Sequence, residues 1–191
     1  MQIPLNTPNL LTLTRIALIP VFVILYYLPV AWSATATTII FILAAMTDWL
    51  DGYLARRWQL ISPFGAFLDP VADKLMVVVA LVLVIQTNPV IWVTLPVLVI
   101  IGREIAISAL REWMAILGAR AQVAVSQIGK IKTTAQITAI IFLLYQHDIG
   151  SIPIYTIGLV LLYTAVILTL WSMLIYLKAA WPQINQATPK Q

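Results

Sequence analysis

Four aspartates are spaced so that two helices could present them to one cation site. They occur in two groups with small residues: Asp48, Asp51, Gly52 and Ala55, then Gly65, Asp69 and Asp73. Members recur at i, i+3, i+4 and i+7 in the first group and at i, i+4 and i+8 in the second, so each group shares a helical face. Neighbouring carboxylates repel one another unless a cation lies between them. Oxygen ligands suit Mg²⁺, Mn²⁺ or Ca²⁺, and two such metals can support phosphoryl transfer.

The composition of the chain is that of a membrane protein. Of its 191 residues, 62% are hydrophobic and only 9% are charged, whereas about 25% are charged in an ordinary soluble domain. The sequence has no cysteine and a single histidine, His147, so the usual zinc ligands are scarce. We interpret the net charge of +4 as cytoplasmic anchoring of a membrane protein, and we expect no nucleic-acid partner.

Apolar runs of span length, about 20 residues, predict an all-α, polytopic membrane protein with six transmembrane helices in one bundle. The predicted spans lie near residues 10–28, 33–57, 63–86, 90–117, 128–146 and 153–177. Turn residues separate them, and residues 1–9 form a short interfacial segment. We expect a single membrane domain over residues 1–191. The A-x-A pattern at residues 34–36 resembles a signal-peptide cleavage site, but an uncleaved first span fits the long apolar run better.

The charged residues indicate both orientation and depth. The predicted loops at 29–32, 86–89 and 147–152 contain no Lys or Arg, so the positive-inside rule places both termini in the cytoplasm. The uncharged stretch 33–47 is too short to span alone, and its helix reaches full length only by including the aspartates. The carboxylates should therefore lie at the cytoplasmic interface and face one polar cavity, because charges inside a membrane are costly.

Two other interpretations of the aspartates remain open at this point. They could form interfacial salt bridges with Arg56, Arg57 and Lys74, with Gly52 serving helix packing alone. They could instead form the permeation site of a divalent-cation transporter. Against a transporter, the opposite halves of the six predicted helices contain no carboxylate that would continue a path.

The aspartate-rich stretch resembles the signature of the CDP-alcohol phosphatidyltransferase family, D-x-x-D-G-x-x-A-R-x8-G-x-x-x-D-x-x-x-D. Every signature position is matched, at Asp48, Asp51, Gly52, Ala55, Arg56, Gly65, Asp69 and Asp73. The similarity continues through NLLTLTR, REIAISALREWMAILG and GKIKTTAQ to LTLWSMLIYL. It implies a homodimeric enzyme of the bacterial inner membrane, with a cytoplasmic active site, that makes anionic phospholipid from CDP-diacylglycerol and releases CMP. The longer similarity favours sn-glycerol 3-phosphate as acceptor over serine, an inositol phosphate or phosphatidylglycerol.

The resemblance also implies roles for individual residues. Asp48, Asp51 and Asp69 would bind two divalent cations, Mg²⁺ or Mn²⁺, while Asp73 would complete the metal shell and act as general base. The expected contacts to CDP-diacylglycerol are Asn9, Thr12, Gly52, Ala55, Arg56, Ser62 and Gly65. Asn9, Thr12 and Arg15 recur every three residues and could reach one site. Their alternative role is to cap the first helix.

The phosphate of the acceptor requires cations of its own. The candidates are Arg103, Arg111, Lys130 and Lys132, with Ser108 and Thr133 as further donors and Glu104 and Glu112 as residues that orient the cations. On an ideal helix Arg103 and Arg111 lie within about 80° of each other, whereas Lys130 and Lys132 are about 200° apart. The two lysines therefore should not face one site. Arg120, Lys178 and Lys190 are better explained as residues that reach the headgroups.

Overall fold

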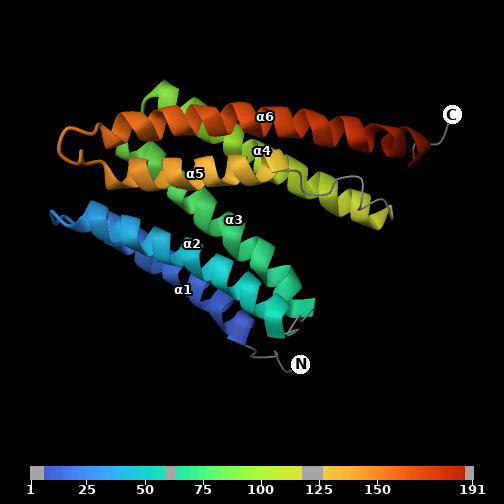
Figure 1. Cartoon of the computed structure of the whole chain (residues 1–191), viewed down its shortest axis with the longest axis horizontal. Coiled ribbons are helices and arrows are strands. Elements are labelled where there is room, and N and C mark those ends of the chain that lie inside the picture. The colour runs from blue at the N-terminus through green and yellow to red at the C-terminus, as the bar shows by residue number, and fades with distance from the viewer. Residues whose placement is uncertain (1–6, 59–62, 118–126, 188–191) are drawn as a thin grey trace. The chain divides into compact units, whose positions relative to one another are not determined.

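A computed structural model describes residues 7–58, 63–117 and 127–187 of the chain (Figure 1). Their regular structure is six helices: α1 (Thr7–Tyr27), α2 (Ser33–Trp58), α3 (Pro63–Thr87), α4 (Ile91–Ile116), α5 (Gln127–Tyr145) and α6 (Ile154–Ala187). The predicted all-α class is confirmed, and the first five helices end close to the predicted limits. The predicted last span, residues 153–177, almost coincides with the first part of α6, which continues to Ala187. The residues after position 177 include Lys, Ala and Gln, which are good helix formers, so the helix continues beyond its apolar run.

Three of the six described helices have the length and composition of membrane spans. Within the described residues, three long apolar segments could cross a bilayer, Asn9–Tyr27, Ile91–Ile116 and Ile154–Pro182, and two shorter apolar segments are Ser33–Asp48 and Ile131–Tyr145. Large apolar side chains such as Ile105 and Ile167 are exposed on these helices, as a lipid-facing surface requires. The chain is therefore an all-α membrane protein.

Residues 1–89 and 140–155 form one compact unit of the chain. In it, α1 packs against both α2 and α3. Phe22 of α1 and Phe41 of α2 are buried with their ring centroids 6.1 Å apart. Ala72 and Ala80 of α3 are fully buried; small residues of this kind let membrane helices approach closely.

Polar contacts fix the end of this unit where α1 finishes and α2 begins. The Ser33 hydroxyl shares its one proton between the backbone carbonyls of Leu25 (2.6 Å) and Tyr26 (3.1 Å), which satisfies groups at the end of α1. The Tyr26 hydroxyl lies 3.0 Å from Thr87 Oγ1 at the end of α3.

The turn predicted before α6 is confirmed, since Gly150 has φ +61°, a conformation that favours glycine.

Residues 90–139 and 156–191 form a second compact unit. Its apolar core includes Ile107 and Met114 of α4 with Tyr176 and Ala180 of α6. The Tyr163 hydroxyl of α6 donates to the backbone carbonyl of Trp92 in α4 at 2.9 Å. These contacts hold α4 and α6 together and bring arginines of α4 next to polar side chains of α6.

Candidate active site

One face of α1 contacts aspartates of the predicted metal site. Asn9, Thr12 and Arg15 lie on this face and are almost completely buried. Thr12 Oγ1 donates a hydrogen bond of 2.5 Å to Asp69 Oδ1. Arg15 Nη1 lies 3.2 Å from Asp48 Oδ1 and also donates to Asp73 Oδ1. Thr12 and Arg15 therefore both contact aspartates of the predicted site, whereas the placement of Asn9 against the same site stays a prediction.

Asp48 of α2 and Asp73 of α3 converge on Arg15. Because one guanidinium nitrogen contacts both Asp48 Oδ1 and Asp73 Oδ1, these two oxygens lie close together. The Arg15 side chain is 1% exposed, whereas those of Asp48 and Asp73 are 46% and 40% exposed. The buried guanidinium therefore offsets one of the two negative charges, and both carboxylates remain accessible to a ligand. This arrangement brings two helices to a common point, as their spacing predicted.

The donor set is chemically suited to a hard divalent cation. Carboxylate oxygens are the ligands that Mg²⁺ and Mn²⁺ prefer, and Asp48 and Asp73 already share one positive group. Among the described side chains no group of three or more His, Cys, Asp or Glu is arranged to hold a metal. The Asp51 side chain, the remaining predicted ligand on α2, lies outside the described set. The four-aspartate metal site therefore stays a prediction.

The other predicted contacts to CDP-diacylglycerol are only partly described. Gly65 is buried near the start of α3. Gly52, Ala55 and Arg56 belong to α2, but their side chains lie outside the described residues, as does Ser62 altogether. These assignments stay predictions.

Sequence reasoning missed Arg15 as the cation that pairs with Asp48 and Asp73. Its spacing from Asn9 and Thr12 indicated the shared face, but the salt-bridge alternative considered only Arg56, Arg57 and Lys74. Asp73 lies 58 residues from Arg15 in the sequence, so their pairing depends on how α1 packs against α3. Local spacing carries no such information.

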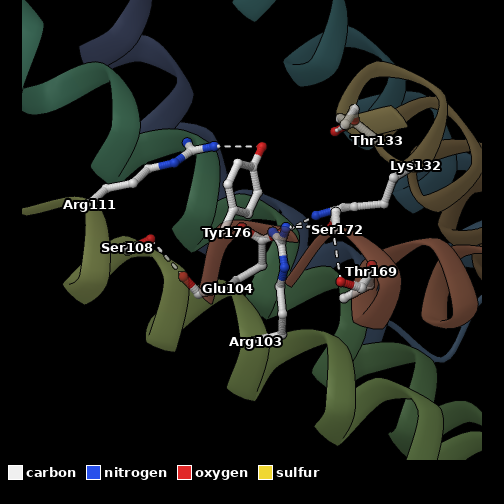
Figure 2. A network of polar contacts seen from close by, with 10 residues as sticks. Arg103, Glu104, Ser108, Arg111, Lys132, Thr133, Thr169, Ser172 and Tyr176 are labelled. Carbon is white, nitrogen blue, oxygen red and sulfur yellow. Dashed lines mark hydrogen bonds and ion pairs between the residues drawn. The ribbon is translucent and has the colours of Figure 1, made fainter. Parts of the chain in front are cut away.

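A second polar cluster lies on α4, α5 and α6, and Figure 2 shows its side chains pointing toward one another. Arg103 Nη1 is 3.2 Å from Glu104 Oε1, and Lys132 Nζ donates to the same oxygen. Arg103 and Lys132 are both buried, so their charges need this partner. The expectation that Glu104 orients a cation is consistent with these contacts.

Arg103 and Arg111 are held by two residues of α6. Their guanidinium carbons lie 5.7 and 5.2 Å from the centroid of the Tyr176 ring, respectively. Arg111 Nη2 donates to the Tyr176 hydroxyl at 3.2 Å, and Arg103 Nη2 donates to Ser172 Oγ at 2.7 Å. The prediction that the two arginines share a helical face is confirmed. The buried Nε atoms of both arginines have no hydrogen-bond partner among the described residues.

The other residues predicted to bind or orient the acceptor make no side-chain hydrogen bond or ion pair with Arg103, Arg111 or Lys132 that the structure describes. The hydroxyls of Ser108 and Thr133 donate to the backbone carbonyls of Glu104 (2.6 Å) and Gly129 (2.9 Å), so a phosphate would have to displace these bonds. The Lys130 side chain lies outside the described set, and Glu112 is exposed. His147 is exposed in the loop after α5, as expected.

Comparison with known proteins places these two clusters in a family context. The CDP-alcohol phosphatidyltransferase family matches residues 5–171 of the chain. Curated relatives in Shigella flexneri serotype 5b and Escherichia coli K12 are each 57% identical over 175 residues, which is 92% of this chain and 94% of theirs. Both relatives are named CDP-diacylglycerol–glycerol-3-phosphate 3-phosphatidyltransferase.

Proposed function

The chain belongs to the CDP-alcohol phosphatidyltransferase family, and from that premise we propose that it transfers the phosphatidyl group of CDP-diacylglycerol to sn-glycerol 3-phosphate. The products are phosphatidylglycerol phosphate and CMP, so the enzyme acts in anionic phospholipid biosynthesis. The observation that carries this proposal is the 57% identity, over nearly the full length of both chains, to enzymes named for this reaction.

The aspartate cluster is proposed to hold the diphosphate of the donor. Asp48, Asp51, Asp69 and Asp73 would bind two Mg²⁺ or Mn²⁺ ions, which when present offset the negative charge of the diphosphate and of the leaving CMP. Asn9, Thr12, Gly52, Ala55, Arg56, Ser62 and Gly65 would surround the cytidine diphosphate. The hydrogen bond from Thr12 to Asp69 supports this assignment, because it ties α1 to a proposed metal ligand.

Asp73 is proposed as the general base of the transfer. Its carboxylate would take the proton of the acceptor hydroxyl, whose oxygen then forms a bond to the phosphorus of the phosphatidyl group. The bond from that phosphorus to the oxygen of CMP breaks, and CMP leaves with the electron pair. The partial exposure of Asp73 supports this role, because a base must be reachable by substrate.

The phosphate of the acceptor is proposed to bind the α4–α5–α6 cluster, through Arg103, Arg111 and Lys132, with Lys130 as a further candidate. Three cations and Glu104 give the described members of the cluster a net charge of +2, close to the opposite of a phosphate monoester dianion. The free Nε donors of the two arginines supply hydrogen bonds that such a ligand would satisfy.

Location and assembly complete the proposal. Both termini and the active site would face the cytoplasm of a bacterial inner membrane, which the absence of Lys and Arg from three predicted loops supports. The enzyme would act as a homodimer, as its resemblance to the family implies. Mass measurement of the purified enzyme in lipid nanodiscs tests the dimer directly.

The substrate assignment is tested by comparing acceptors one at a time. Purified enzyme in mixed micelles receives CDP-diacylglycerol, Mg²⁺ or Mn²⁺, and one acceptor from a panel of glycerol 3-phosphate, serine, inositol phosphate and phosphatidylglycerol. We expect metal-dependent CMP release with glycerol 3-phosphate and little with the others. CMP release with a different acceptor alone would overturn the choice of acceptor but retain the family chemistry.

A further inference from the structure

We propose that Ser172 and Tyr176 of α6 are positioning residues that fix Arg103 and Arg111 at the separation needed to hold the acceptor's phosphate. This inference rests on the acceptor site proposed above. Neither α6 residue needs to touch the substrate, because both would act through the arginines of α4.

Tyr176 is placed between the two arginines (Figure 2). Arg103 and Arg111 are two helical turns apart on α4, and both guanidinium groups lie within 6 Å of the one ring centroid. Tyr176 is 4% exposed and belongs to an apolar core cluster with Ile107 and Met114. A cation over the face of a desolvated ring is attracted to it. One immobile ring therefore restrains both cations.

Hydrogen bonds then fix the direction of each guanidinium. The Tyr176 hydroxyl accepts from Arg111 Nη2, and Ser172, one turn earlier on α6, accepts from Arg103 Nη2. Ser172 is itself oriented, since its hydroxyl donates to the backbone carbonyl of Thr169 at 2.9 Å. Each arginine thus uses one terminal nitrogen for α6 and leaves its Nε donor without a partner among the described residues.

This arrangement suits a phosphate in a way that two mobile arginines would not. A long arginine side chain loses rotamer freedom when it binds a ligand, and that loss weakens binding. Contacts that order the side chain in the free protein remove part of this cost. The ring and the two hydroxyls should therefore raise affinity for the acceptor without affecting affinity for CDP-diacylglycerol.

The test compares Tyr176→Phe, Tyr176→Leu and Ser172→Ala in the full-length enzyme. We expect Tyr176→Leu to raise the KM for glycerol 3-phosphate by about tenfold or more, and Tyr176→Phe and Ser172→Ala by about three- to tenfold. The inhibition constant of inorganic phosphate, competing with glycerol 3-phosphate, should rise in parallel. The KM for CDP-diacylglycerol should stay within about twofold, which separates positioning from a general loss of structure.

Tyr163→Phe is the matched control, because Tyr163 is on the same helix and its hydroxyl bonds to Trp92 rather than to an arginine. It should leave both KM values unchanged. If Tyr176→Phe and Ser172→Ala fold normally and alter neither the acceptor KM nor phosphate inhibition, the positioning role is wrong. Arg111→Met tests the acceptor site separately from the positioning role. If it raises the KM for glycerol 3-phosphate while the α6 variants have no effect, the acceptor site stands and only the positioning role is wrong. If it leaves this KM unchanged, both proposals are wrong.

Discussion

At the scale of single residues, Asp73 has the environment of a base that is oriented before substrate arrives. Its Oδ1 accepts from Arg15, and its side chain is partly exposed. In Asp73→Asn the amide retains a similar shape but cannot take a proton. We expect CMP release to fall by about 10²- to 10⁴-fold, the usual contribution of a general base, while CDP-diacylglycerol still binds in an equilibrium assay. Asp148→Asn, in the loop after α5, should have no effect, and near-normal turnover in Asp73→Asn would exclude the base assignment.

Arg15 supplies buried positive charge to Asp48 and Asp73. In Arg15→Met these carboxylates lose their common partner, and their mutual repulsion should destabilise the metal-free protein by about 1–3 kcal/mol, a value reduced because both carboxylates are partly exposed. Added Mn²⁺ should then raise the midpoint of thermal unfolding more in the variant than in the unmodified protein. Lys178→Met removes the same charge from an exposed position and should not change the response. An equal Mn²⁺ response in all three proteins would contradict the proposed metal site.

Removing the charge of Glu104 should affect phosphate binding in two opposite ways. Glu104→Gln raises the net charge of the α4–α5–α6 cluster, which by Coulomb attraction alone would tighten phosphate binding. It also removes the carboxylate that holds Lys132 and Arg103. We expect the loss of orientation to dominate and the KM for glycerol 3-phosphate to rise by about tenfold. Glu112→Gln, exposed on the same helix, is the control. A lower KM in Glu104→Gln would mean that the carboxylate competes with the acceptor.

At the scale of helices, the sequence predicted the elements better than the contacts between them. Apolar run length and turn residues predicted where each of the first five helices begins and ends, because these depend on neighbouring residues. The contacts that Arg15 and Tyr176 make could not be predicted in the same way. Each contacts a residue more than 50 positions away, and such contacts are decided by packing.

The packing of α1–α3 depends on small side chains, and Ala80 provides the clearest test. It is fully buried in α3, so a larger side chain must push neighbouring atoms apart. We expect Ala80→Leu to destabilise the protein by about 1–3 kcal/mol, observed as a lower midpoint of thermal unfolding in detergent. Ala106→Leu makes the same change at an exposed position of α4 and should leave the midpoint unchanged. Equal midpoints for the two variants would show that this part of α3 is not closely packed.

At the scale of the whole molecule, the distribution of Lys and Arg predicts an orientation that the natural absence of cysteine makes simple to test. Single cysteines can be introduced as Ser151→Cys, in the exposed turn before α6, and as Gln191→Cys, at the C-terminal residue. We expect a membrane-impermeant maleimide to label the first in intact spheroplasts and the second only after permeabilisation. The unmodified chain controls for labelling elsewhere. The reverse pattern would place the C-terminus outside the cytoplasm. The aspartates would then face the outside as well, and CMP would be released there, so the proposed cytoplasmic active site would be wrong.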